Sequence, residues 1–211
     1  MFRTGALVEV GGWDAYNVTE DADLGLRLSH WGYRARMLDS TTYELATAGT
    51  GAWLRQRSRW IKGYLQTWLV HARRRPGRGA WRHALTLHFL IGAVGVSALL
   101  NPVFWLLYVI WLAGLDLPVE TLFPPPLGAM AVAALLLGNA FQLWLFVLAP
   151  LRRGWHDLVL FGLTAPAYWV LQSVAGYRAL WQLLVRPFYW EKTEHEAGEA
   201  PEAIAAKVAP A

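Results

Sequence analysis

Three long uncharged apolar runs constrain the fold of this chain more than any other feature. They cover residues 84–115, 121–151 and 158–177. A helix needs about 20 apolar residues to cross a hydrocarbon core of about 30 Å, and each run is long enough. The apolar content of 55% follows largely from these runs. The sequence therefore predicts a mainly α-helical membrane protein.

Basic residues gather at the ends of the apolar runs. Five arginines precede the first run, and two follow the second: Arg73, Arg74, Arg75, Arg78, Arg82, Arg152 and Arg153. The positive-inside rule places such clusters in the cytoplasm, and anionic lipid adds about 1 kcal/mol for each basic residue near the surface. The chain has a net charge of +4. We therefore expect its basic residues to contact membrane lipid and not nucleic acid.

The first two runs predict two spans, at about 84–115 and 127–149. As one helix the first run would be about 48 Å long, which is too long for a simple crossing. We expect an interfacial lead-in segment, then a span with a kink or break near Pro102. The loop with Asp116 and Glu120 carries no basic residue, so it is placed outside the cell.

The third run behaves differently from the other two. If it crossed the membrane, Arg178, Arg186 and Lys192 would lie outside, against the positive-inside rule. We therefore expect an interfacial or re-entrant helix over 157–184, broken near Pro166, with both ends in the cytoplasm. A plain third span remains the alternative on hydropathy alone.

Residues 1–75 have the character of a soluble domain. Helices are predicted over 4–10, ending at Gly11-Gly12, and over 20–30, with Thr19 as the N-cap. Strands are predicted over 34–38 and 41–46. Because so few elements cannot close a core, we expect the tail of an α/β domain whose beginning lies outside this sequence.

Two carboxylates stand in the first turn of the predicted helix over 20–30. Thr19-Glu20-Asp21 can serve simply as a cap that complements the helix dipole, an effect of about 1 kcal/mol or less. Alternatively, Asp21 is a general base that the helix N-terminus holds anionic. The triplet alone leaves both interpretations open.

A helix from about Ala52 to Arg75 joins the soluble part to the membrane part. Gln56, Arg59 and Trp60 share one of its faces, because they recur at i, i+3 and i+4. This pattern is typical of a basic juxtamembrane helix with an interfacial tryptophan. In a binding site, Arg59 would instead hold a phosphate, Trp60 would stack on a sugar ring, and Gln56 would hydrogen-bond the sugar or the arginine.

The aromatic stretch after the third run also has two interpretations. Trp190, Lys192 and Thr193 lie in a segment that suits either an aromatic belt at the headgroups or a loop that folds back over a ligand. The tail over 194–211 is acidic and rich in alanine and proline, so we expect disorder. Cysteine is absent, and the histidines have no metal-ligand spacing.

In their order these motifs resemble the membrane-integrated, processive family 2 glycosyltransferases, the cellulose-synthase-like group. The matching text is Phe2-Arg3, Gly11-Gly12-Trp13, Thr19-Glu20-Asp21 with Asp23-Leu24-Gly25, Gly32-Tyr33-Arg34, Gln56-x-x-Arg59-Trp60 and the run from Arg186 to Thr193. The resemblance implies a GT-A-like catalytic domain at the cytoplasmic face of the plasma (bacterial inner) membrane. It also implies inverting transfer of a sugar from a nucleotide sugar, such as a UDP-sugar, to a growing β-linked polysaccharide.

The resemblance also assigns roles to individual residues. Asp21 would be the catalytic base, with Thr19 and Glu20 beside it. Gln56, Arg59 and Trp60 would lie at the acceptor end near the donor diphosphate. Trp190, Lys192 and Thr193 would belong to a gating loop over 186–193, although the cellulose synthases' own loop motif is not matched.

One departure from the family pattern is large. The donor half of the family, with its DxD pair and its Mg or Mn site, precedes the TED motif, and its metal ligands have no counterpart in this sequence. We therefore expect a C-terminal fragment that is inactive alone, from a truncated or incompletely recorded gene or a split enzyme whose donor site another chain supplies. The rival hypothesis is a non-catalytic accessory or glycan-passage subunit of a polysaccharide synthesis complex.

Overall fold

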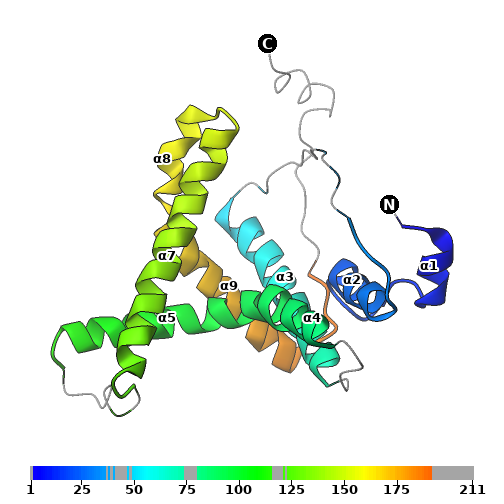
Figure 1. The fold of residues 1–211 in the computed structure, drawn as a ribbon, viewed down its shortest axis with the longest axis horizontal. Helices are drawn as coiled ribbons and strands as arrows, with labels where there is room; N and C mark the ends of the chain where they lie inside the picture. Colours follow the sequence, from blue (N-terminus) through cyan, green and yellow to red (C-terminus); the bar gives the residue numbers. More distant parts are fainter. Residues whose placement is uncertain are drawn as a thin grey trace.

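The computed structural model describes residues 2–36, 38, 40, 47, 49–73, 80–115, 121 and 123–191, and helices dominate it (Figure 1). The elements used below are α1 (Thr4–Glu9), α2 (Glu20–His30), α3 (Thr50–Ala72), α4 (Ala80–Leu85), the π-helical η1 (Thr86–Gly92), α5 (Ala93–Leu112), α7 (Leu127–Arg152), the 3₁₀ turn η2 (His156–Leu158), α8 (Val159–Gly162) and α9 (Ala165–Val185). The prediction of a mainly α-helical protein is confirmed.

The predicted strand over 34–38 does not form. The described residues of this range belong to no helix or strand, and the second predicted strand, over 41–46, lies outside the described residues. A strand needs a partner for its backbone hydrogen bonds, and even a two-stranded hairpin is marginally stable alone. The described residues of 1–75 form helices and no strand, so the α/β remnant predicted for this range is not seen in them.

Two helices in the described part of the chain are long and apolar enough to cross a membrane, Thr86–Leu112 and Leu127–Arg152. They begin within two residues of the predicted spans. Of the kink or break predicted near Pro102, the break is absent, since α5 runs through this proline. The irregular segment lies earlier, where η1 widens the helix before α5 begins. The 26 residues of α7 include none that is buried, as expected of a helix facing lipid.

The third apolar run forms a bent pair of helices. His156–Gly162 and Ala165–Val185 meet at an angle of 59°. The break falls directly before Pro166, which occupies the first turn of α9. By length and composition this pair fits either one broken span or a re-entrant loop.

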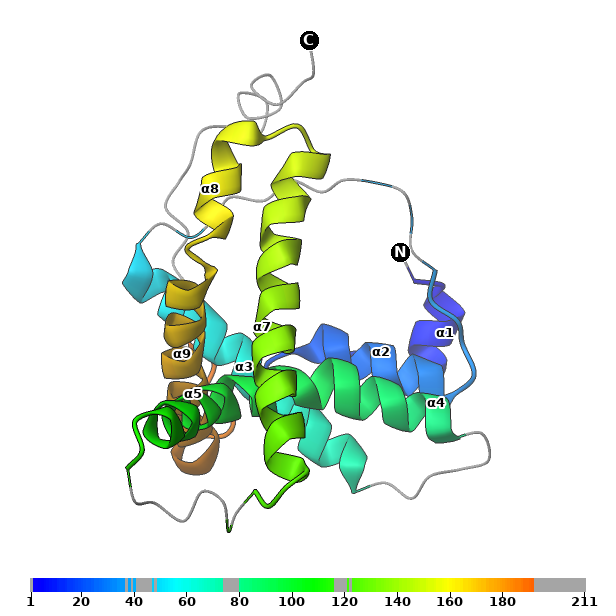
Figure 2. The same cartoon turned by 60° about the vertical axis from the view of Figure 1, so that its left-hand side comes forward.

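The core lies where α3, α5 and α9 meet, and small residues allow the close approach. Ala98, Ala175 and Ala179 are buried there against Ile61 and Leu65. Figures 1 and 2 both show α9 packed along α3, and Figure 1 shows α1 and α2 on one side of α3, with α7 and α8 on the other. Helix α3 is therefore the structural link between the N-terminal helices and the apolar helices.

Candidate functional site

The TED motif rests directly on α3. Thr19 immediately precedes α2 and is 7% exposed. A Cβ placed on Gly63 of α3 would lie only 2.3 Å from Thr19 Cγ2, so the two backbones approach as closely as glycine permits. Gly63 stands one helical turn after Arg59. The TED segment and the helix that carries the Gln56–Trp60 motif are therefore in direct contact.

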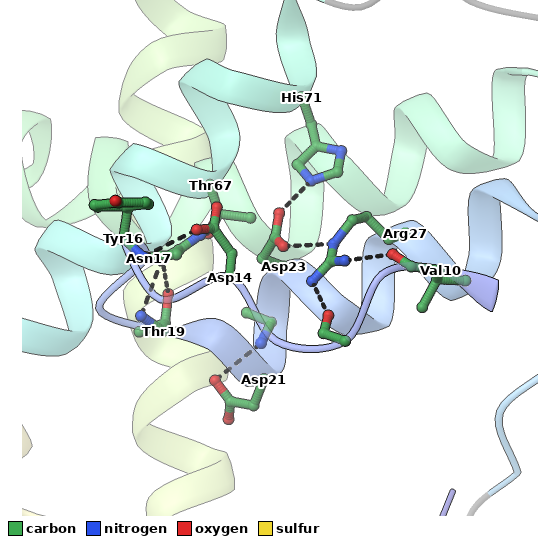
Figure 3. A network of polar contacts seen from close by, with 12 residues as sticks. Val10, Asp14, Tyr16, Asn17, Thr19, Asp21, Asp23, Arg27, Thr67 and His71 are labelled. Atoms are coloured by element: carbon green, nitrogen blue, oxygen red, sulfur yellow. Dashed lines mark hydrogen bonds and ion pairs between the residues drawn. The ribbon is translucent and has the colours of Figure 1, made fainter. Parts of the chain in front are cut away.

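Asn17 fixes this contact by hydrogen bonds, and it was not among the predicted site residues. Its Nδ2 donates to Thr67 Oγ1 of α3 at 2.8 Å, and its Oδ1 accepts from the backbone N–H of Thr19 at 3.0 Å (Figure 3). Thr19 occupies the predicted N-cap position but makes no side-chain cap hydrogen bond. Its hydroxyl instead lies 3.4 Å from Asn17 Oδ1, because the side chain is packed between Asn17 and α3.

Asp21 faces solvent. Its Oδ1 accepts the backbone N–H of Ala22 at 2.9 Å, and the described part of the chain offers this carboxylate no other hydrogen bond. Figure 3 shows its side chain on the side of α2 away from His71 and Thr67. Glu20 is half-buried beside it. Asp21 is thus an accessible carboxylate in the first turn of a helix.

A buried polar network centred on Asp23, two residues after Asp21, holds α2 against α3. Asp23 Oδ2 accepts from Arg27 Nε at 2.7 Å, and Asp23 Oδ1 lies 2.7 Å from His71 Nε2 of α3. Arg27 also donates to the carbonyls of Val10 and Gly12 (Figure 3). Burial alone would raise the pKa of Asp23, but its hydrogen bonds with His71 and Arg27 outweigh burial and hold that pKa below its usual range.

The Gln56–Trp60 motif lies on α3, where Gln56, Arg59 and Trp60 are half-buried. Arg57, which the sequence reasoning left out, stacks over the ring of Trp60 at 4.5 Å and near that of Trp53 at 5.7 Å. One face of Trp60 is therefore occupied by a guanidinium. Arg59 Nε is buried and has no hydrogen-bond partner among the described residues.

The segment after α9 folds back onto α3. Residues 186–191, here named the strap, place the ring of Trp190 5.9 Å from the Arg59 guanidinium carbon. Lys62 Nζ donates to the carbonyl of Tyr189. Of the predicted gating residues, Trp190 is therefore beside the QxxRW motif, while Lys192 and Thr193 lie outside the described residues.

A family model for glycosyl transferase family group 2 matches residues 1–190. The chain belongs to this family. No curated protein matches the chain, and no solved structure does. Membership supports an enzyme that transfers a sugar from a nucleotide-sugar donor to an acceptor.

The metal expected for a family 2 glycosyltransferase has no candidate ligand group here. The described residues contain no cluster of three or more His, Asp or Glu side chains able to hold an ion. Asp21 and Asp23 do not form a pair for this purpose, since Asp23 is buried in its network with Arg27 and His71. These residues therefore do not fit an Mg or Mn site.

Proposed function

We propose that residues 1–211 are the acceptor side and the membrane part of a processive, cellulose-synthase-like glycosyltransferase. The enzyme would transfer a sugar from a UDP-sugar to a growing β-linked polysaccharide, with inversion, at the cytoplasmic face of the plasma (bacterial inner) membrane. The contact of Thr19 with Gly63 is the observation that carries this proposal. It packs the start of α2, which carries the exposed Asp21, against α3 one helical turn after Arg59, and α3 continues toward the spans.

In this proposal Asp21 is the general base. Its carboxylate accepts the proton of the acceptor hydroxyl as that oxygen attacks C1 of the donor sugar. The bond from C1 to the diphosphate oxygen breaks with its electron pair, and the nucleoside diphosphate leaves from the opposite face. Much of the contribution of such a base comes from its position relative to the acceptor hydroxyl.

Arg59 is the candidate for contact with the leaving diphosphate. Its Nε is buried and has no partner among the described residues, so contact with an oxyanion would require the side chain to shift. Trp190, stacked near Arg59 and 62% exposed, offers an open aromatic face to a sugar ring. Trp60 has Arg57 over its ring and therefore one remaining face, while Gln56 stands one turn before it.

A polar cavity among the apolar helices supports passage of the product. It has a volume of about 360 Å³ and lies between α5, α7 and α9. Amides from all three helices line it, beside the aromatic rings of Tyr168 and Trp169: Asn101, Asn139, Gln142 and Gln172. Asn139 donates to the carbonyl of Leu135 at 2.7 Å, whereas Gln172 Oε1 is buried without a partner among the described residues. Amides are costly to place in lipid, so their convergence suits a polar polymer.

A non-catalytic glycan-passage subunit is the second candidate function. It is supported by this cavity, together with the lack of a metal-binding cluster among the described residues. The exposed carboxylate of Asp21 in the first turn of α2 favours the enzyme. The two hypotheses differ in what Asp21 does.

The test expresses the complete reading frame that contains these residues and assays membrane vesicles with radiolabelled UDP-sugars. Asp21→Asn should lower polymer synthesis by roughly 10²–10⁴-fold while leaving UDP binding unchanged, because only the proton acceptor is lost. Asp157→Asn, at another exposed carboxylate, is the matched control. Synthesis above a tenth of the wild-type rate in Asp21→Asn would exclude Asp21 as the base. A wild-type protein that makes no polymer from any UDP-sugar would favour the passage subunit.

A further inference from the structure

The strap (residues 186–191) is held by polar anchors and not by burial of its aromatic rings. Phe188 is 67% exposed, Tyr189 47% and Trp190 62%, so their burial contributes little. Glu191 is different, because its side chain is only 13% exposed. It accepts from Arg178 at 2.6 Å and from Gln182 at 3.0 Å, two residues one turn apart on α9. Each carboxylate oxygen of Glu191 therefore has a donor on α9, and the bond from Arg178 is charge-assisted, which makes it stronger than a neutral hydrogen bond.

Lys62 is the anchor on the α3 side. It is completely buried, which is rare for a lysine, and its ammonium donates to the carbonyl of Tyr189. Burial lowers the pKa of Lys62 below its usual range, and the negative charge of Glu191 opposes that shift. A buried ammonium requires such compensation, so Lys62 and the strap depend on each other.

Between these anchors the strap reaches both halves of the site. Trp190 lies over Arg59 of the QxxRW motif. The ring of Phe188 meets the ring of Tyr16 edge to face at 6.0 Å, three residues before Thr19. Gln66 of α3 donates to the carbonyl of Tyr16 at 3.2 Å, which fixes that end of the contact.

We propose that Lys62 and Glu191 are positioning residues, which hold the strap so that Trp190 stays over Arg59 at the donor side of the site. This inference rests on the proposed function for the role of Arg59. Glu191 fixes the strap to α9, and Lys62 fixes it to α3. Neither side chain needs to touch substrate, since each acts through Trp190 and Arg59.

The test uses the full chain in detergent and follows chymotrypsin cleavage after Phe188, Tyr189 and Trp190 by mass spectrometry. Glu191→Gln keeps the shape of the side chain and removes the charge. We expect it to raise the cleavage rate at these three sites about tenfold, because a charge-assisted contact closes the strap and cleavage follows the open population. Cleavage after Tyr33, which is on another exposed segment, should not change. Asp157→Asn is the control for loss of an exposed carboxylate.

Lys62→Met tests the second anchor and should also accelerate cleavage of the strap. Because Lys62 is buried, this variant is compared only if its melting temperature is close to that of the wild type; Glu191→Gln, at the end of the strap, remains the decisive variant. In vesicles that synthesise polymer, Glu191→Gln should raise KM for the UDP-sugar about tenfold and leave kcat within twofold. Asp21→Asn should instead lower kcat.

Three results would overturn the inference. The first is strap cleavage in Glu191→Gln at the wild-type rate. The second is faster cleavage at every site with a lower melting temperature, which would make Glu191 merely structural. The third is a released strap with an unchanged KM. If the wild-type protein makes no polymer, the proposed function fails, while selective cleavage of the strap still supports anchoring by Glu191.

Discussion

Gly63 is the residue that most directly allows the TED motif to pack against α3. A Cβ at this position would lie 2.3 Å from Thr19 Cγ2 and 2.4 Å from Thr19 Oγ1. Thr19 cannot turn away easily, because its backbone N–H is bonded to Asn17 and its side chain is buried. A substitution here must therefore push α2 away from α3.

We expect Gly63→Ala to lower the free energy of unfolding by about 1–2 kcal/mol. Overpacking costs about 1–3 kcal/mol, and the better helix propensity of alanine returns up to about 1 kcal/mol. Thermal unfolding in detergent, followed by circular dichroism, measures this difference. Gly51→Ala in the same helix is the matched control, because the added Cβ would lie 3.7 Å from Arg55 in ordinary contact.

Removing the Cγ2 methyl of Thr19 should relieve only part of the strain, because the Cβ of Thr19 would still lie 2.8 Å from the added Cβ. The double variant Gly63→Ala with Thr19→Ser is therefore expected to recover part of the lost stability and of any lost activity. If Gly63→Ala is as stable as Gly51→Ala, the close approach of α2 and α3 is not present in the protein.

At the scale of elements, α2 is held by one buried network that joins three parts of the chain. Asp23 belongs to α2, His71 to α3, and the carbonyls that Arg27 binds belong to the segment after α1. Aspartate titrates near pH 3.9 in an unfolded chain, and the pKa of Asp23 is lowered in the folded protein. The network's contribution is therefore complete above about pH 4 and is lost as pH falls through the lowered pKa.

Melting temperature against pH should show this dependence. Between pH 7 and pH 5 we expect no loss from Asp23, and below about pH 4 we expect a progressive loss that the Asp23→Asn variant lacks. At pH 7 that variant should be less stable by about 3 kcal/mol, since Arg27 and His71 lose a buried carboxylate. Asp14→Asn, at an exposed carboxylate, serves as the control. Equal acid sensitivity of Asp23→Asn and wild type would contradict the lowered pKa.

The helices could be predicted from sequence, because their signals are local. Apolar runs predict the two long helices, and Gly11 and Gly12 end α1 near the expected residue. The contacts of the site carry no such local signal. Thr19 meets Gly63 and Lys62 meets Tyr189 across 44 and 127 residues of chain, so tertiary packing decides them.

The errors have physical causes of the same kind. A threonine before a helix predicts a side-chain cap, but packing against α3 turns the Thr19 hydroxyl to Asn17. The indole of Trp60 looks free in a sequence, yet Arg57 covers one of its faces. The predicted strand over 34–38 has alternating character but finds no partner among the described residues. In the first two cases a packed neighbour takes up a group that looks free in the sequence, and in the third the partner that a strand needs is missing among the described residues.

At the scale of the whole molecule, the strap constrains how the chain crosses a membrane. Helix α3 precedes the first candidate span, and the strap follows the last apolar helix, yet Lys62 of α3 bonds Tyr189 of the strap. A chain that leaves one side of a membrane and returns to it crosses an even number of times. The helices Thr86–Leu112 and Leu127–Arg152 supply two crossings. If both helices cross, we predict that the bent pair from His156 to Val185 enters and leaves on one side.

This argument predicts the accessibility of three single cysteines, each unique because the chain has no cysteine of its own. Arg153→Cys and Arg186→Cys flank the bent pair, Leu115→Cys lies between the two spans, and all three positions are exposed. In intact cells a membrane-impermeant maleimide should label Leu115→Cys alone, and in inside-out vesicles it should label the other two. Both arginine positions also then obey the positive-inside rule. Labelling of Arg153→Cys and Arg186→Cys from opposite sides would mean that the bent pair is a third span, and the strap could not rest on α3.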